Sequence, residues 1–555
     1  MASSFLGLGT SYSGLTANQR ALQVTSHNIA NANTVGFTRQ RMDMQAYKPD
    51  QLPGGLGTLG LGVDVTAVKQ IRDEFLDFKY RGENGKAGEW AARESVLKDI
   101  EAIMNEPTDS SIASVMDEFY EALHELNKTP ETVTARTLVR QRAIALTKEI
   151  SRMSTSFKEL QADLNIEFKS AVTDLNNNAS QISQLNKIIY ESELEGGRAN
   201  DIRDQRNVLL DEMSELVDIQ YYEDENQRFH VLLNGTEIVS HYRHDELVTK
   251  NRDTMLHDDD AIDLVDVEWA SGATFETNSG RIKGLMDARD NIEGDYKGIP
   301  YYIDKLNEFS NTLTSQMNMI HKDGYGLNGS TGVNMFTMKN MSTADYEEHL
   351  LTKGLTKNGT AGSPIKVTSS VISALDDLPS DATLQEKQIA LTRNMSSILQ
   401  NNEEYSGKAI KLIKDDYYIV DKIKASDLTI AKDLEDVNKI AASTTEEGLP
   451  GNGENALNIA KVRHNQEMFE WGSPDDFMKS LISNLGVDAQ EAYRVSENQD
   501  VMLDAIINKR ESISGVSLDE EMTNMIKFQK AYQASARMVN VFDEMLDLIV
   551  NRLGV

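Results

Sequence analysis

The feature that most constrains this chain is a long central segment without a helix breaker. No glycine or proline occurs from Glu131 to Glu195. Within this segment, apolar residues recur at steps of three and four from Ile150 to Ile189, which places them on one face of an α-helix. The segment therefore predicts a helical rod of roughly 95 Å that packs in a bundle or a coiled coil.

Local signals suggest where this rod begins and ends. Thr129 followed by Pro130 is typical of an N-cap with proline at the first helical position. Three successive asparagines at 176–178 have weak helix propensity, so we expect the rod could break there. Gly196-Gly197 is expected to end it.

Composition excludes several functions. The chain of 555 residues holds 56 Lys and Arg against 88 Asp and Glu, a net charge of −32, which disfavours a nucleic acid partner. It has no cysteine, which excludes disulfides, thiolate catalysis and Cys-ligated zinc. No apolar run is long enough to span a membrane, and the N-terminus lacks the basic and apolar regions of a secretory signal peptide.

Charge is also uneven along the chain. Residues 1–60 carry a net +2 and residues 491–555 a net −4, which leaves −30 for the middle. We interpret the middle as solvated and the first forty residues as suited to contact.

The N-terminal segment predicts an amphipathic helix from Tyr12 to about Ala32, with an apolar residue at every seventh position. Its opposite face is polar but nearly uncharged, so it can pack on several sides without burying ions. Residues 31–36 are expected to end the helix in a turn, where Gly36 permits a positive φ.

The C-terminal segment predicts a matching helix. Ser517 and Glu520 fit a capping box, and no glycine or proline follows before Arg552. Apolar residues at three- and four-residue steps give a coiled-coil stripe. We therefore expect the chain ends to pair and to form an assembly interface that includes Leu15, Leu22, Ile29, Asn31, Gly36, Phe37, Met525, Tyr532, Ala536, Val539, Phe542 and Leu546.

The remaining segments predict a mainly α protein with β-rich insertions. Residues 218–275 alternate as in a small antiparallel sheet, and 333–450 is mixed, with strands near 364–371 and 407–420 and a helix near 385–400. Separate helices are expected at 477–485 and 493–512. We expect a terminal coiled-coil domain (1–62 with 512–555), a helical bundle domain (63–217 with 280–332 and 451–511), a small β insertion (218–279) and an outer mixed α/β domain (333–450).

Two patterns resemble ligand sites. Residues 324–329 match G-x-G-x-x-G, but a predicted helix precedes them where a dinucleotide site needs a strand. His241, His244 and the run from His257 to Asp260 could ligate a metal, although no known metal motif accompanies them. We expect no cofactor, metal or catalytic residue. A metal-dependent hydrolase in 218–450, using His241, His244 and Asp258–Asp260, and a cytosolic coiled-coil scaffold remain as alternatives.

Both ends of the chain resemble bacterial flagellar axial proteins, the family of rod, hook and hook-associated proteins. The similar segments are Ser13–Leu22, Ser26–Arg39 and Glu520–Ala536. Three interior segments, Asp201–Leu216, Arg281–Asp290 and His321–Gly329, are similar to the hook-associated members, as is Ser514–Glu520. A different axial protein, such as hook protein, remains as an alternative. Residues 333–450 carry no such resemblance.

The resemblance implies a structural, non-catalytic subunit that lies between the hook and the filament, with several copies around the flagellar axis. Its implied partners are further copies of itself, hook protein, hook-associated protein 3 and an export chaperone that binds the C-terminal helix. It also implies export through the flagellar type III channel without a cleaved signal peptide, and an extracellular location. No nucleic acid and no membrane insertion are expected.

Overall fold

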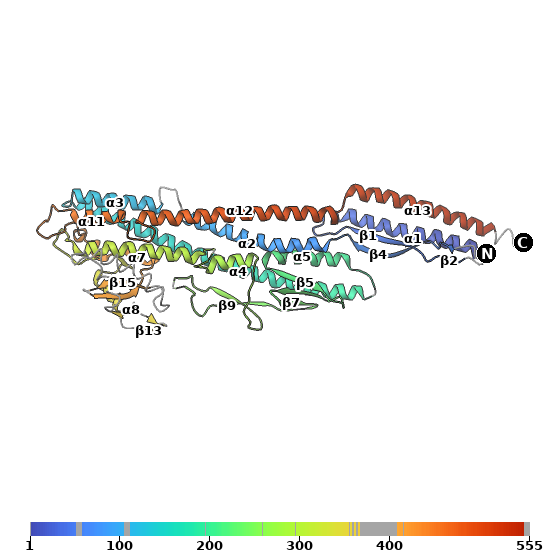
Figure 1. Ribbon diagram of the computed structural model, residues 1–555, viewed down its shortest axis with the longest axis horizontal. Coiled ribbons are helices and arrows are strands. Elements are labelled where there is room, and N and C mark those ends of the chain that lie inside the picture. The colour runs from blue at the N-terminus through green and yellow to red at the C-terminus, as the bar shows by residue number, and fades with distance from the viewer. Residues whose placement is uncertain are drawn as a thin grey trace.

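The computed structural model describes residues 2–51, 58–104, 111–194, 196–257, 259–294, 296–353, 356–357, 360–361, 365–366, 408–413 and 416–548. The molecule is elongated, with both chain ends at one tip and the helical body behind them (Figure 1). It is mainly helical with small sheets, which confirms the predicted fold class in its general form.

The terminal unit consists of two long helices and a β-ribbon. Helix α1 (Ala2–Ala30) packs along α13 (Leu518–Asp547), so the two ends of the chain lie side by side (Figure 1). After α1, strands β1 (Gln40–Ala46) and β4 (Val63–Gln70) form an antiparallel pair, as do the short strands β2 (Asp50–Gln51) and β3 (Thr58–Leu59). Strand β4 was predicted to belong to the helical bundle domain, but it pairs with β1 and so belongs to the terminal unit.

The body is built around one very long helix. Helix α4 (Val133–Glu193) runs for 61 residues, and its buried face joins most of the core. The helices around it are α2 (Glu74–Met104), α3 (Ile112–Lys128), α5 (Asn200–Leu216), α6 (Arg281–Asp290), α7 (Ile299–Asp323), α11 (Glu454–Lys461) and α12 (Pro474–Ser514).

Helix α4 differs from its prediction at two points. Its N-cap is Thr132, whose hydroxyl accepts from the Ala135 amide, and not Thr129. The asparagine run does not break it. The Asn176 side chain donates to the Leu247 carbonyl and accepts from the Leu247 amide, at 2.8 and 2.9 Å. These two hydrogen bonds tie the helix to a strand edge and offset the weak propensity of asparagine.

The C-terminal helices also differ from their predictions. Helix α12 is continuous across residues 486–492, and its capping box lies at Ser473 and Asp476. The box predicted at Ser517 does not form, although α13 begins there. Glu520 pairs instead with Arg39, a long-range contact that local spacing does not reveal.

The β-rich insertions lie on one side of the helices. The sheet predicted at 218–275 is confirmed as two antiparallel units: β5 (Ile219–Glu223), β6 (Phe229–Leu233), β7 (Thr236–Ser240) and β8 (Arg243–His244), then β9 (Leu247–Asn251) with β10 (Val265–Trp269). Farther along the chain are β11 (Phe336–Met338), α8 (Thr343–Lys353), β12 (Thr356–Lys357), β13 (Thr360–Ala361), β14 (Ile365–Lys366), β15 (Lys408–Ile413), β16 (Asp416–Asp421) and β17 (Leu428–Ile430). The helix predicted near 385–400 lies outside the described residues.

The glycine-rich segment 324–329 is a tight turn against the loop before α11. The Tyr325 amide donates to the Ser443 carbonyl, and a Cβ on Gly324 would fall 2.1 Å from the Asn455 side chain. Helix α7 precedes this turn, so the strand that a dinucleotide site requires before its glycines is absent from this described part of the chain.

His321, just before that turn, makes stability depend on pH. It is fully buried between the Val333 carbonyl and the Ala441 amide, and burial lowers its pKa to about 4. Between pH 6.5 and 4 the unfolded chain therefore binds more protons than the folded chain. The free energy of unfolding decreases as the pH is lowered through this window, and the loss reaches about 3 kcal/mol at pH 4.

Denaturant unfolding at pH 7 and at pH 4 checks this expectation. His321→Gln, which can still donate and accept, should show a smaller loss between the two pH values than the unmodified chain. Changing His124, an exposed residue of α3, to Gln is the matched control and should keep the full loss. Equal pH dependence in all three proteins would contradict the assignment.

Candidate assembly surface and the joint behind it

The predicted contact residues of the first helix are only partly covered by the rest of the chain. Leu15, Leu22 and Ile29 are half-buried, whereas Ala17, Ala21, Thr25 and Asn28 of the same helix are fully buried. Asn31 and Phe37 are half-buried and Gly36 is exposed. Gly36 has φ +76°, as predicted, and a Cβ there would fall 2.1 Å from Val208 of α5.

The predicted stripe of α13 is half-buried, and part of it faces α1. The Phe542 ring packs on Gly7, where a Cβ would lie 2.4 Å from the ring, and Ser535 packs on Gly14. The same intermediate exposure holds for Met525, Tyr532, Ala536, Val539 and Leu546. One chain thus partly covers these residues by itself.

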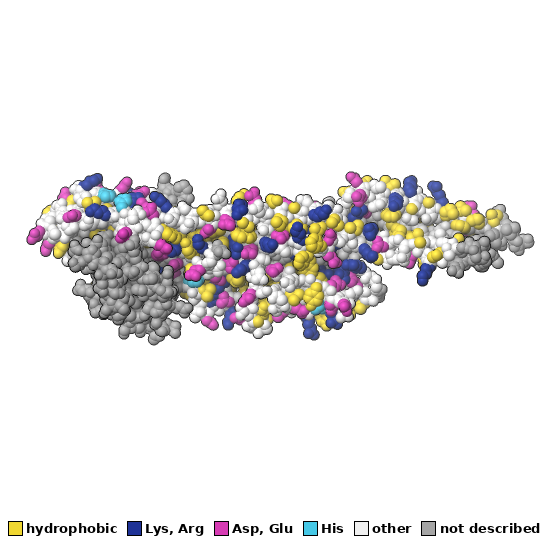
Figure 2. Space-filling view, viewed as in Figure 1, with side chains coloured by type: hydrophobic (Ala, Val, Ile, Leu, Met, Phe, Trp, Pro, Cys, Tyr) yellow, Lys and Arg dark blue, Asp and Glu magenta, His cyan; other side chains and the backbone are white. Residues whose placement is uncertain are grey.

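Two further apolar surfaces lie on α13 beyond the predicted contact residues. The proximal patch consists of Leu518, Met522 and Ile526, which are 49 to 58% exposed. The distal patch consists of Met538, Val541, Met545 and Leu548, which are 41 to 48% exposed. Figure 2 shows hydrophobic side chains along this helix towards the tip. Contiguous exposed apolar residues of this kind mark an interaction surface.

The two patches point in different directions. Because successive helical residues turn by about 100°, the proximal patch lies about a third of a turn from the distal patch. The side that faces α1, marked by Ser535 and Phe542, lies about a quarter of a turn from the distal patch and about two fifths of a turn from the proximal patch. Helix α13 therefore has one side packed within its own chain and two apolar sides left for other molecules.

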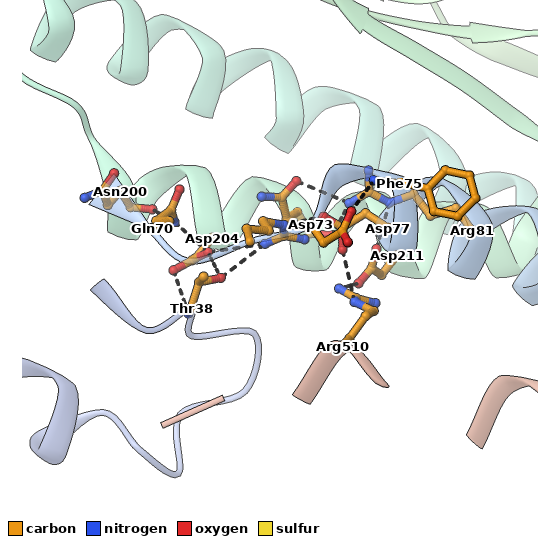
Figure 3. A network of polar contacts seen from close by, with 12 residues as sticks. Thr38, Gln70, Asp73, Phe75, Asp77, Arg81, Asn200, Asp204, Asp211 and Arg510 are labelled. Carbon is orange, nitrogen blue, oxygen red and sulfur yellow. Dashed lines mark hydrogen bonds and ion pairs between the residues drawn. The ribbon is translucent and has the colours of Figure 1, made fainter. Parts of the chain in front are cut away.

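A buried polar network, here called the joint, attaches the terminal unit to the body (Figure 3). At its centre, the Asp204 carboxylate of α5 accepts from the Thr38 amide at 2.9 Å and the Thr38 hydroxyl at 2.7 Å. Gln70 of β4 donates to it at 2.8 Å, and Arg72 lies 3.4 Å away. Burial raises the pKa of Asp204, and the hydrogen bonds from Thr38 oppose that rise.

A second cluster of the joint links the two chain ends. Glu521 of α13 is 3% exposed and lies 2.7 Å from the Arg39 guanidinium. Asn28 of α1 donates to the same carboxylate at 3.1 Å and also to the Gln40 carbonyl at 2.9 Å. A buried carboxylate needs such partners, so α1, β1 and α13 are held in one arrangement.

A third cluster fixes α12 to the body. Arg510 of α12 pairs with Asp77 of α2 at 3.0 Å and with Asp211 of α5 at 2.9 Å. Arg81 of α2 donates to Asp211 at 2.7 Å (Figure 3). Three helices thus meet through charge-assisted hydrogen bonds, which are stronger than neutral ones.

The candidate metal residues are not arranged as a metal site. The His257 ring lies 2.9 Å from the Asp290 carbonyl, and the His244 ring lies 3.2 Å from the Ser183 hydroxyl. His241 is buried beside Tyr190 and Tyr242, and Asp258 lies outside the described residues. Within the described residues, no group of three or more His, Cys, Asp or Glu could hold a metal ion.

Comparison with known proteins agrees with this architecture. The sequence model described as "Flagellar hook-associated protein FlgK helical domain" matches residues 97–336. Those described as "Flagella basal body rod protein" and "Flagellar basal body rod FlgEFG protein C-terminal" match residues 8–38 and 509–553.

Relatives and a solved structure cover most or all of the chain. "Flagellar hook-associated protein 1" of Bacillus subtilis (strain 168) is 29% identical over 100% of this chain and 99% of its own. The protein of the same name in Escherichia coli (strain K12) is 23% identical over 98% and 99%. The structure of the flagellar hook junction protein FlgK from Burkholderia pseudomallei covers 79% of this chain and 100% of its own, with 12% identity and a TM-score of 0.56, and supports the fold.

The paired terminal helices, the helical body and these matches make the chain similar to flagellar axial structural proteins. Within that class, the full-length relatives described above are both flagellar hook-associated protein 1, which confirms the resemblance to the hook-associated members predicted from the sequence. The comparisons support this interpretation over a hook protein or a metal-dependent hydrolase. In the described part of the chain, no helix is both long and apolar enough to cross a membrane.

Proposed function

We propose that this chain is a non-catalytic subunit of the junction between the flagellar hook and the filament, present in several copies around the flagellar axis. The observation that carries this proposal is the pair of exposed apolar patches on α13, which leaves two sides of the terminal unit for neighbouring copies. The names of the full-length relatives and of the Burkholderia protein support the location at the junction.

The predicted contact residues of the chain ends, from Leu15 to Phe37 and from Met525 to Leu546, have a place in this proposal. Those on α1 and α13 lie in the two helices that pack together, and their remaining exposed area contributes to contacts with other copies. The proximal and distal patches supply the larger exposed apolar area. We propose hook protein on one side of the junction and hook-associated protein 3 on the other.

The same patches suggest a need for protection before assembly. Exposed apolar surface of this kind promotes aggregation of a free chain. An export chaperone that binds α13 would cover both patches until the chain leaves the cell. Export through the flagellar type III channel without a cleaved signal peptide, and an extracellular location, complete the proposal. It requires no cofactor or metal.

Deletion of the gene tests this function. We expect cells that keep their hooks, lack filaments and release flagellin into the medium, because filament subunits would have no platform on the hook. Electron microscopy of the cells and flagellin immunoblots of the medium measure both effects. A plasmid copy of the gene should restore filaments. Normal filaments in the deletion strain would contradict the proposal.

A further inference from the structure

A groove lies beside the joint, separate from the patches of α13. The loop after α1, the last turns of α4 and the outer side of α5 enclose about 550 Å³. Apolar side chains line much of this space, and its ionisable lining residues are His27, Asp201 and Asp204. Val35 and Ile188 in the lining are 85% and 44% exposed.

Two aromatic rings stand exposed at the same level of the molecule. Phe75 and Phe78, one turn apart at the start of α2, are 70% and 64% exposed. Asp204, which lines the groove, lies 3.4 Å from Arg72, only three residues before Phe75. The rings and the groove are therefore close to one another along the long axis of the molecule.

The rings and the groove open on opposite sides of the body. Helices α2 and α5 run in the same direction, because Arg72 meets Asp204 and Arg81 meets Asp211. Both helices are viewed here from their N-terminal ends. On α2, the side with the two rings lies about 100° clockwise from the side that contacts α5. On α5, the side with the groove lies at a similar clockwise angle from the side that contacts α2. Because the two contacting sides face each other along the line that joins the helix axes, equal clockwise rotations place the rings and the groove on opposite sides of that line.

We infer that Phe75 and Phe78 of one copy insert into this groove of the next copy around the axis. In copies that are related by rotation about an axis parallel to the long axis, the rings of one copy would face the groove of the next, because the two features lie at the same level on opposite sides of the body. Such a head-to-tail contact can close a ring, unlike a symmetric contact between identical surfaces. The inference rests on the proposed function, in which several copies surround the axis.

The local charges favour a second copy as the occupant. The chain carries a net charge of −32, so neighbouring bodies repel one another over most of their surface. The exposed Glu74 and Lys79 flank the pair of rings along the chain, and Asp201 on the groove rim, which Lys79 would face, has a 57% exposed side chain. In the inferred contact, Lys79 of one copy would lie opposite Asp201 of the next copy beside the inserted rings. This pair of opposite charges makes the contact complementary although both bodies are acidic overall.

Engineered cysteines test this contact cleanly, because the chain has none of its own. The double variant Phe78→Cys/Ile188→Cys, expressed in the deletion strain, should give a ladder of disulfide-linked oligomers when isolated flagella are oxidised and run on a non-reducing gel. The matched control is Phe78→Cys/Tyr222→Cys, since Tyr222 is 48% exposed on β5 outside the groove. We expect at least ten times less linked oligomer from this control.

Other outcomes would overturn the inference. Disulfide-linked dimers from Phe78→Cys alone would mean that the rings meet each other. Filamentous flagella without a ladder would reject the groove contact and leave the junction role intact. If the cysteine variants fail to build flagella, a photoreactive phenylalanine at position 78 keeps the ring. It should then crosslink to peptides from 31–37 or 181–188 of another copy, and capture only by hook protein or by a chaperone would reject the inference.

Discussion

Replacing Arg39 with alanine is expected to lower the free energy of unfolding by about 3–5 kcal/mol and to detach α13 from the joint. The physical reason is that Glu521 would keep a buried carboxylate whose remaining side-chain hydrogen-bond donor, among the described residues, is Asn28. Chemical denaturation measures the stability, and hydrogen exchange or limited proteolysis measures the release of α13.

The chain supplies a matched control two residues away. Arg41 is also an arginine near an acidic residue, but its side chain is 69% exposed and its partner Asp43 lies 3.3 Å away. Arg41→Ala should cost less than about 1 kcal/mol, as is typical of surface ion pairs. Similar losses from both variants would show that burial of Glu521 is not what makes Arg39 important.

The change Ile526→Asp should abolish incorporation at the junction without unfolding the subunit. Ile526 is 58% exposed in the free chain, so aspartate there remains hydrated before assembly. In an assembled apolar contact the same carboxylate would lose its water without gaining a partner, at a cost of several kcal/mol. Because 1.4 kcal/mol is tenfold in affinity, we expect self-association at least a hundredfold weaker and cells without filaments.

Thr523→Asp is the matched variant for this second prediction. It adds the same charge to an exposed position of the same helix, about a sixth of a turn outside the proximal patch and about four turns before the distal patch. Its filaments should remain, and circular dichroism and melting curves should agree for the unmodified chain and both variants. Loss of filaments with Thr523→Asp but not with Ile526→Asp would place the contact elsewhere on α13.

The long helices could be predicted where periodic apolar residues follow one another without glycine, as in α4 and α13. Helix α2 was missed because Gly82, Gly85 and Gly88 interrupt its first half. Two of these glycines allow close packing: a Cβ at Gly88 would fall 2.4 Å from the Glu215 carbonyl of α5, and one at Gly85 3.1 Å from that of Ser214. Tertiary contact outweighs propensity there, and a sequence pattern carries no sign of it.

The candidate surface was predicted only in part for a related reason. Periodicity located the stripe of α13 that faces α1, but it could not tell which apolar residues a second chain would cover. The joint was missed because its partners are remote in sequence, as Thr38 and Asp204 or Arg39 and Glu521 are. The segment that holds Asp204 was singled out through the family resemblance, which gave it no partner.

The unbroken backbones of α4 and α12 have a mechanical consequence. Bending such a helix stretches the hydrogen bonds on its convex side over many turns at once, so both resist curvature along their whole length. Between α12 and α13, by contrast, the helical ladder is interrupted over residues 515–517, and the crossing is braced by the joint and by the hydrogen bond from the Arg39 amide to the Ser514 carbonyl. In the proposed junction, the subunit would therefore consist of two stiff segments, and its compliance would be concentrated at this short crossing.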